Sequence, residues 1–235
     1  MCRMAAESGT RELVATPHSN VQYSYDPVAV QGLVGKLQAD LGDQIFLHRG
    51  CDLHLTSDNI RAAIKDRSRF TINGHQYLLV EFSDEILLQG TAQVFQQLRD
   101  AGIVPIITHP ERNQHLRKSH PRLAEWIHRG CLIQITAQSL LGRFGERALA
   151  SAIAMMDGGL VHFIASDAHN LTGRTPKLMP AYEFVRYRWG EAMANKLLID
   201  NPWAVLWGET IDVQKVAVSR RGRKRRKRVA RISPA

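Results

Sequence analysis

Side chains that commonly bind divalent metals recur at one place in several apolar segments of this sequence. Each segment begins apolar and ends in a polar cluster, and five of the six clusters contain a His, Asp or Glu. In a parallel α/β barrel, reactive residues gather at the C-terminal ends of the strands, where the loops converge. We therefore expect these side chains to share one site. The candidate metal ligands are His18, Asp52, Glu81, His109, Asp167 and His169.

Imidazole and carboxylate ligands together suit Mn²⁺, Fe²⁺ or Zn²⁺. Asp167 and His169 stand two residues apart, so they point to one face if the strand conformation continues. A carboxylate can bridge two cations, and clustered cations turn a bound water into hydroxide and stabilise phosphoryl oxygens. The set predicts a two- or three-metal centre that hydrolyses a phosphate ester through a metal-activated hydroxide.

Two arginines near these residues suit a phosphate substrate. Arg112 belongs to the THPER stretch, and Arg174 lies five residues beyond His169. A guanidinium can hold two phosphate oxygens at once, so we expect both to stabilise the transferring phosphoryl charge. His54 stands two residues after Asp52, but we expect it beside the ligands or at the surface.

Each candidate taken alone has a plainer explanation. An isolated His18 is more often a hydrogen-bonded turn residue than a metal ligand. An isolated Glu81 could be a carboxylate at a helix N-terminus. The prediction therefore rests on the set and not on its members.

A cysteine-dependent phosphatase is excluded by spacing. That mechanism needs an arginine six positions after a reactive cysteine, so that phosphate is cradled around the thiolate. The residues six positions after the three cysteines are Ser8, Ser57 and Ala137. The cysteines also lack the spacing of a disulfide framework or a structural zinc site.

Short β-rich stretches alternate with helical patterns along the chain, which predicts βαβ units and a parallel sheet. The predicted strands span 12–18, 45–55, 77–82, 104–112, 131–140 and 161–169. The predicted helices span 27–41, 91–101, 120–129, 145–157 and 176–200, the last as one or two helices, and 201–209 closes the domain.

The net charge of +9 is confined to the C-terminal end. Residues 220–231 carry nine basic and no acidic residues, and the remaining 22 Lys and Arg balance 22 Asp and Glu. We expect one domain over 1–212 and a basic, disordered tail over 213–235 that is either solvated or binds anions non-specifically. The apolar runs are too short to span a bilayer and no signal peptide is visible, so we expect a cytoplasmic protein.

The motifs TPH, GCD, LLVEF, THPER, QITAQSLLGRFG and HFIASDAHN occur in this order. With them the chain resembles the bacterial PHP-type (polymerase and histidinol phosphatase superfamily) protein-tyrosine phosphatases of capsular and exopolysaccharide biosynthesis, over residues 1–209. The resemblance implies an α/β fold, a distorted (β/α)7 TIM-like barrel. It also implies a metal cluster, commonly manganese with iron or zinc as alternatives, that hydrolyses phosphotyrosine, usually on a tyrosine autokinase. The six candidate ligands would bind the metals, and Arg112 and Arg174 would bind phosphate.

Two features depart from the family pattern. The commoner family residue at Asp52 is Glu, which is one methylene longer, so this strand would sit closer to the metals. The family also opens with a strand that ends in His-x-His, whereas this sequence begins with MCRMAAESGT, which looks like the middle of the first helix. We expect a barrel that lacks its first strand and exposes two sheet edges, and a start codon that lies upstream.

Two other functions remain open at this point. One is a PHP phosphoesterase for a small phosphomonoester such as a sugar phosphate or histidinol phosphate, which QSLLGRFG and THPER favour less. The other is an inactive truncated remnant that binds nucleic acid or a membrane through its basic tail in a salt-sensitive way. The sequence is also compatible with an oligomer.

Overall fold

The computed structural model describes residues 1–83 and 90–211. All strand pairs in this part of the chain are parallel, and they form a six-stranded sheet of order β2-β4-β5-β6-β7-β8 and a two-stranded sheet of β1 and β3. The strands are β1 (Glu12–Ala15), β2 (His18–Ser19), β3 (Phe46–Arg49), β4 (Asp52–His54), β5 (Tyr77–Glu81), β6 (Val104–Thr108), β7 (Leu132–Thr136) and β8 (Phe163–Ala165). The predicted α/β class with a parallel sheet is confirmed.

Each of the six predicted strand segments contains at least one strand, but the first two segments are broken in the middle. Residues 16–17 separate β1 from β2, and residues 50–51 separate β3 from β4. A Cβ at Gly50 would lie 3.1 Å from the side chains of Val14 and Ile72, so a larger residue at the second break would push these neighbours apart. At these breaks the chain changes direction, so that β1 and β3 pair in the smaller sheet while β2 and β4 join the larger one.

The helices surround the strands. The α-helices are α1 (Cys2–Glu7), α2 (Pro27–Leu41), α3 (Ser57–Lys65), α4 (Arg67–Phe70), α5 (Thr91–Asp100), α6 (His120–His128), α7 (Ala137–Leu140), α8 (Glu146–Asp157), α9 (Met179–Trp189), α10 (Glu191–Asn195) and α11 (Asn201–Trp207). Three 3-10 turns, η1 (Gly42–Gln44), η2 (Ile72–Gly74) and η3 (Leu116–Lys118), and the π-helical η4 (Lys196–Asp200) complete the description.

The sequence pattern predicted most of these helices. Residues 27–41 form α2 as predicted, and Asp26 caps it by accepting from the backbone N–H groups of Val28 and Ala29 at 2.9 and 3.2 Å. Residues 57–70 contain α3 and α4, and neither helix was among those predicted from the sequence.

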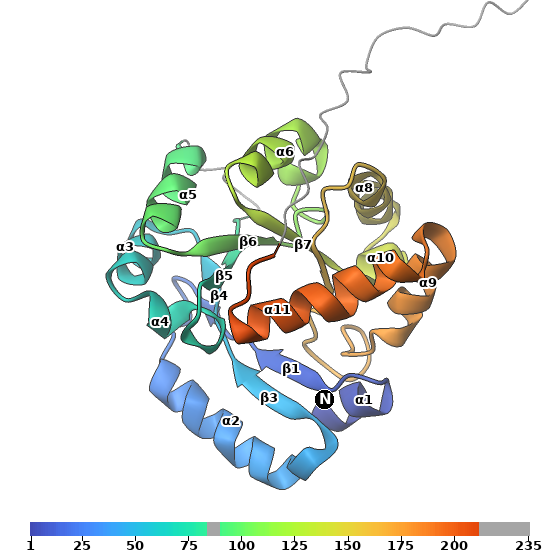
Figure 1. The fold of residues 1–235 in the computed structure, drawn as a ribbon, viewed down its shortest axis with the longest axis horizontal. Helices are drawn as coiled ribbons and strands as arrows, with labels where there is room; N and C mark the ends of the chain where they lie inside the picture. Colours follow the sequence, from blue (N-terminus) through green and yellow to red (C-terminus); the bar gives the residue numbers. More distant parts are fainter. Residues whose placement is uncertain (84–89, 212–235) are drawn as a thin grey trace, which may run out of the picture.

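The core has two parts because the strands are buried on both faces. In β5, Leu78 and Val80 face the cluster that packs under the outer helices, while Tyr77 and Leu79 face a second cluster. Figure 1 shows the helices arranged around the strands, with α11 crossing in front of their centre. Val205 and Leu206 of α11 pack into the second cluster, so this helix covers one end of the strand arrangement.

In the described part of the chain, no helix is long and apolar enough to cross a membrane. The strands at the two ends of the larger sheet are β2 and β8. The predicted division at residue 212 and the basic tail over 213–235 lie outside the described residues, so both remain predictions, as does the strand expected upstream.

His162, just before β8, makes the stability of the fold depend on pH. Its ring is buried, and its Nδ1 accepts a hydrogen bond from the Ile133 N–H at 3.1 Å. Burial, together with the charge of Lys196, lowers the pKa of His162 to about 4. The unfolded chain therefore takes up a proton that the folded chain excludes, and stability is lost as pH falls from about 6.5 towards 4, by on the order of 3 kcal/mol.

We predict that His162→Gln, although less stable than the wild type at pH 7.5, shows a weaker loss between pH 7.5 and pH 4.5. The free energy of unfolding from urea titrations at both pH values measures this difference. His128→Ala, at an exposed position in the last turn of α6, serves as the control. Equal pH dependence in His162→Gln and the wild type would contradict the assignment.

Candidate metal centre

The parallel register brings four of the predicted ligands together. His18 of β2 lies opposite Asp52 of β4, and His54 of β4 lies opposite Glu81 of β5. His109 directly follows β6, where its backbone N–H is hydrogen-bonded to β7 at 2.8 Å. Because alternate residues of a strand face the same side, β4 presents both of its polar side chains to the site. We call these five residues the ligand cluster.

Two side chains outside the ligand cluster fix the strand ends that carry it. Asn59 of α3 donates from its Nδ2 to the carbonyl oxygens of Ser19 and His54, at 2.8 and 3.0 Å. Phe82, directly after β5, is buried and stacks on Trp126 of α6 with 5.4 Å between ring centroids. Strands β2, β4 and β5 are therefore held in place where their polar ends meet.

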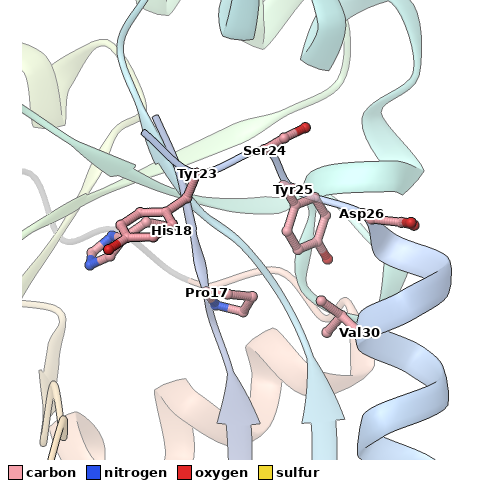
Figure 2. Close-up of a pocket in the computed structure, with 7 residues that line it drawn as sticks. All are labelled: Pro17, His18, Tyr23, Ser24, Tyr25, Asp26 and Val30. Atoms are coloured by element: carbon pink, nitrogen blue, oxygen red, sulfur yellow. The ribbon is translucent and has the colours of Figure 1, made fainter. Parts of the chain in front are cut away.

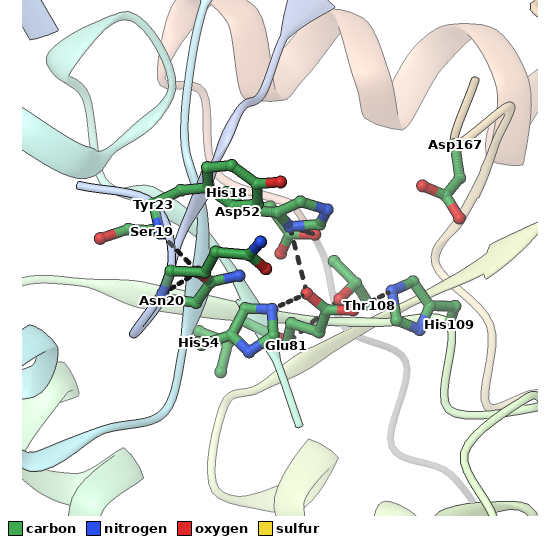
Figure 3. A network of polar contacts seen from close by, with 12 residues as sticks. His18, Ser19, Asn20, Tyr23, Asp52, His54, Glu81, Thr108, His109 and Asp167 are labelled. Atoms are coloured by element: carbon green, nitrogen blue, oxygen red, sulfur yellow. Dashed lines mark hydrogen bonds and ion pairs between the residues drawn. The ribbon is translucent and has the colours of Figure 1, made fainter. Parts of the chain in front are cut away.

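The Glu81 carboxylate lies at the centre of the cluster (Figure 3). Its Oε2 lies 3.2 Å from Nδ1 of His18 and in close contact with Nε2 of His54. Its Oε1 lies 3.1 Å from Nε2 of His109. One carboxylate thus faces imidazoles from three separate segments of the chain.

Glu81 belongs to two groups of candidate ligand atoms. The first group joins it to His18 and His54, and the second joins it to Asp52 and His109. Within each group, the ligand atoms all lie within 4.8 Å of one another. A carboxylate common to two such groups is suited to bridge two cations.

Three buried atoms of the cluster make no hydrogen bond of good geometry among the described residues: His18 Nδ1, Asp52 Oδ1 and Glu81 Oε2, the first and last of which face each other at 3.2 Å as an ion pair. Buried polar atoms in proteins are nearly always paired, so each such atom calls for an explanation. Divalent cations would satisfy all three, and a mixed imidazole and carboxylate set is one that Mn²⁺, Fe²⁺ or Zn²⁺ accepts. The residues present therefore fit a metal centre.

The electrostatics of the cluster favour cations. The adjacent Glu81 carboxylate raises the pKa of His18. Burial and then the charge of Glu81 raise the pKa of Asp52 to about 6. Although burial opposes it, the imidazoles of His109, His18 and His54 hold the pKa of Glu81 well below its usual range. Negative charge is thus concentrated here, and it attracts cations.

Asp167 and His169 lie beside this cluster. Figure 3 shows the Asp167 carboxylate pointing towards it. The Oδ2 of Asp167 accepts hydrogen bonds from both Arg112 and Arg174, which we call the arginine pair. The Nδ1 of His169 lies 3.7 Å from Oδ1 of Asp167, and its ring centroid lies 6.0 Å from that of His18. The structure thus gathers both predicted arginines on one predicted ligand.

His54 lies closer to the centre of the cluster than its sequence position alone indicates. It was expected beside the ligands or at the surface, and its Nε2 contacts the central Glu81 carboxylate, which also makes it a candidate ligand in one of the two groups. A signal was available, because His54 stands two residues from Asp52, the same spacing as His169 from Asp167.

Two of the predicted ligands have a left-handed backbone, with φ of 35° at His109 and 47° at Asp167. This conformation is uncommon for residues other than glycine and is concentrated at functional sites. Each costs on the order of 1–3 kcal/mol and persists where the surrounding contacts over-determine it. Here the contacts with Glu81 and with the arginine pair supply that constraint.

Comparison with known proteins identifies the relatives of this chain. The model of the CpsB/CapC family, described as capsular polysaccharide synthesis, matches residues 1–207. The chain belongs to this family. Tyrosine-protein phosphatase YwqE of Bacillus subtilis (strain 168) is 31% identical to it over 215 residues, covering 90% of this chain and 84% of YwqE. CapC of Staphylococcus aureus is 37% identical over 180 residues, covering 74% and 69%.

A solved structure of the family agrees in fold. It comes from the work on the crystal structures of YwqE from Bacillus subtilis and CpsB from Streptococcus pneumoniae, which are called unique metal-dependent tyrosine phosphatases. It superposes with a TM-score of 0.85 at 29% identity, covering 92% of this chain and 88% of that chain. The resemblance to PHP-type tyrosine phosphatases found in the sequence is confirmed.

We predict that Glu81→Gln removes most of the bound metal, because the shared carboxylate loses its charge for both ligand groups. His54→Ala should lower the metal content less, since His54 belongs to one group. Outer partners of ligands alone contribute 10–100-fold to metal affinity, so we expect a loss of more than about tenfold for Glu81→Gln. Elemental analysis after dialysis against Mn²⁺ measures this, with His128→Ala as the control. Wild-type metal content in Glu81→Gln would remove this residue from the centre.

Proposed function

We propose that this chain is a metal-dependent protein-tyrosine phosphatase of capsular polysaccharide synthesis. The observation that carries the proposal is the Glu81 carboxylate shared by two groups of candidate metal ligands, next to the arginine pair. Hydrolysis of a phosphate monoester needs both a source of hydroxide and positive charge for the phosphoryl oxygens. The relatives YwqE and CpsB are named as tyrosine phosphatases, which supports this reading.

We assign the metal-binding role to the ligand cluster together with Asp167 and His169. Mn²⁺ is our proposal for the native metal, with Fe or Zn as alternatives. Bound cations would lower the pKa of a water molecule and stabilise phosphoryl oxygens. The chain would fix where these cations bind, because Glu81 is held at the end of β5 and His109 in its left-handed turn.

We assign binding of the phosphoryl group to the arginine pair. The Nε atoms of Arg112 and Arg174 are buried and have no hydrogen-bond partner among the described residues. Each guanidinium already donates to Asp167, so the two are oriented towards the same point beside the ligand cluster. Preorganised donors of this kind stabilise charge that develops in the transition state.

A cavity beside the ligand cluster supports phosphotyrosine over a sugar phosphate. It has a volume of about 370 Å³, and His18 forms part of its wall (Figure 2). Pro17, Tyr25 and Val30 make the rest of the lining largely apolar, and Tyr23 contributes a second aromatic ring. Ser24 and Asp26 complete the lining. An aryl group bonded to the phosphate oxygen would bury apolar surface there, whereas a polyhydroxylated substrate would find polar partners only at these two residues and the tyrosine hydroxyls.

The partner and the location follow from the same proposal. We propose a tyrosine autokinase of polysaccharide synthesis as the source of the phosphotyrosine, and a cytoplasmic site of action.

We expect the Mn²⁺-loaded chain to hydrolyse a phosphotyrosine peptide faster than glycerol phosphate, measured by released phosphate. A chelator should abolish both activities. Preference for glycerol phosphate would favour the second candidate function, a phosphoesterase for small molecules. No turnover of either substrate by a chain that retains metal would contradict the phosphatase assignment.

We predict that Val30→Phe, which fills the cavity from α2, lowers kcat/KM for p-nitrophenyl phosphate roughly tenfold while sparing glycerol phosphate. The matched control is Val28→Phe, because Val28 lies in the same helix, is 80% exposed and does not line the cavity. Equal losses for aryl and alkyl phosphates would show that the cavity does not receive the aryl group.

A further inference from the structure

The QSLLGRFG stretch lies against the arginine pair, although none of its residues has a role in the proposed chemistry. The guanidinium of Arg112 lies over the ring of Phe144, 4.4 Å from its centroid. The guanidinium of Arg174 lies 6.0 Å from the same centroid. One aromatic ring thus contacts two cations that come from segments far apart in the sequence.

A tight turn presents this ring. Gly142 and Gly145 flank residues 143–144 and both have left-handed backbones, with φ of 75° and 83°. The turn is closed by a hydrogen bond from the N–H of Gly145 to the carbonyl of Gly142 at 3.0 Å. Glycine is the residue that adopts this conformation without steric cost, so the GRFG pattern forms the turn that carries Phe144.

The same stretch is anchored to the segment that carries Arg112. Glu111 is fully buried, and its Oε1 accepts from the backbone N–H of Thr136 at 3.0 Å and from the Ser139 hydroxyl at 2.7 Å. These bonds tie the THPER turn to the start of α7. Arg112, which directly follows Glu111, is therefore held near the stretch that carries Phe144.

A second anchor reaches the segment that carries Arg174. Gln138 of α7 is buried, and in the amide orientation that satisfies its surroundings it donates to the carbonyl of Gly173 and accepts from the N–H of Thr175, both at 2.9 Å. These partners stand on either side of Arg174 in the sequence. One short stretch thus fastens both arginine-bearing loops.

We propose that Phe144 is a positioning residue that holds the guanidinium groups of Arg112 and Arg174 side by side for the phosphoryl group. A ring face attracts a cation without using its N–H donors, so the donors that Asp167 does not already occupy remain available to phosphate oxygens. An acidic residue in the same place would consume them. The proposal rests on the proposed function only in that the arginine pair binds phosphate.

The experiment compares Phe144→Leu, Phe144→Tyr and, as matched control, Arg143→Ala, the exposed neighbour in the same turn. Calorimetry with inorganic phosphate on the Mn²⁺-loaded chain measures binding without requiring turnover. We expect Phe144→Leu to weaken phosphate binding roughly five- to tenfold, Phe144→Tyr to restore it, and Arg143→Ala to leave it unchanged. Metal content and Tm should stay at wild-type values throughout.

Two kinds of result with the Phe144 variants would overturn the proposal. Wild-type phosphate affinity in Phe144→Leu would show that the ring does not position the arginines. Failure of Phe144→Tyr to restore binding, or loss of metal or Tm together with phosphate affinity, would make Phe144 a general packing residue. A wild-type chain that binds phosphate but does not hydrolyse phosphotyrosine would instead contradict the proposed function and leave the positioning role intact.

Discussion

The arrangement depends on one buried carboxylate that faces three imidazoles. Glu81 ends the central strand β5, and the parallel register places His54 opposite it on β4, while His18 reaches it from β2 and His109 from the end of β6. A buried anion is costly unless cations or donors surround it. The strand breaks, the Asn59 hydrogen bonds and the Phe82–Trp126 stack can all be understood as keeping those partners within reach.

Local features of the sequence were enough to predict the strands and the helix α2. Short β-rich stretches and a proline at the first position of a helical pattern depend on neighbouring residues, so they are visible in the chain itself. The gathering of His18, Asp52, Glu81 and His109 also followed, because carboxyl ends of parallel strands meet at one edge of a sheet. The CpsB/CapC family match then agreed with the resemblance that the motifs had indicated.

What the sequence did not reveal depends on contacts between distant segments. The pairing of Arg112 and Arg174 with Asp167 joins residues up to 55 positions apart, and no local pattern encodes it. The role of Asn59 was missed for the same reason, together with the helix α3 that carries it. His54 was not among the predicted ligands because a single histidine near a ligand has many ordinary explanations, and only the register across β4 and β5 shows that it lies opposite Glu81.

The left-handed backbones at His109 and Asp167 limit how these positions can evolve. Histidine, aspartate and asparagine are several-fold enriched in that conformation compared with other residues that have side chains. Imidazole and carboxylate are also what divalent cations bind. Two independent selections, one for backbone shape and one for ligand chemistry, therefore overlap on the same few amino acids. Descendants that lose the catalytic function should drift at these two positions towards glycine or asparagine before any β-branched residue.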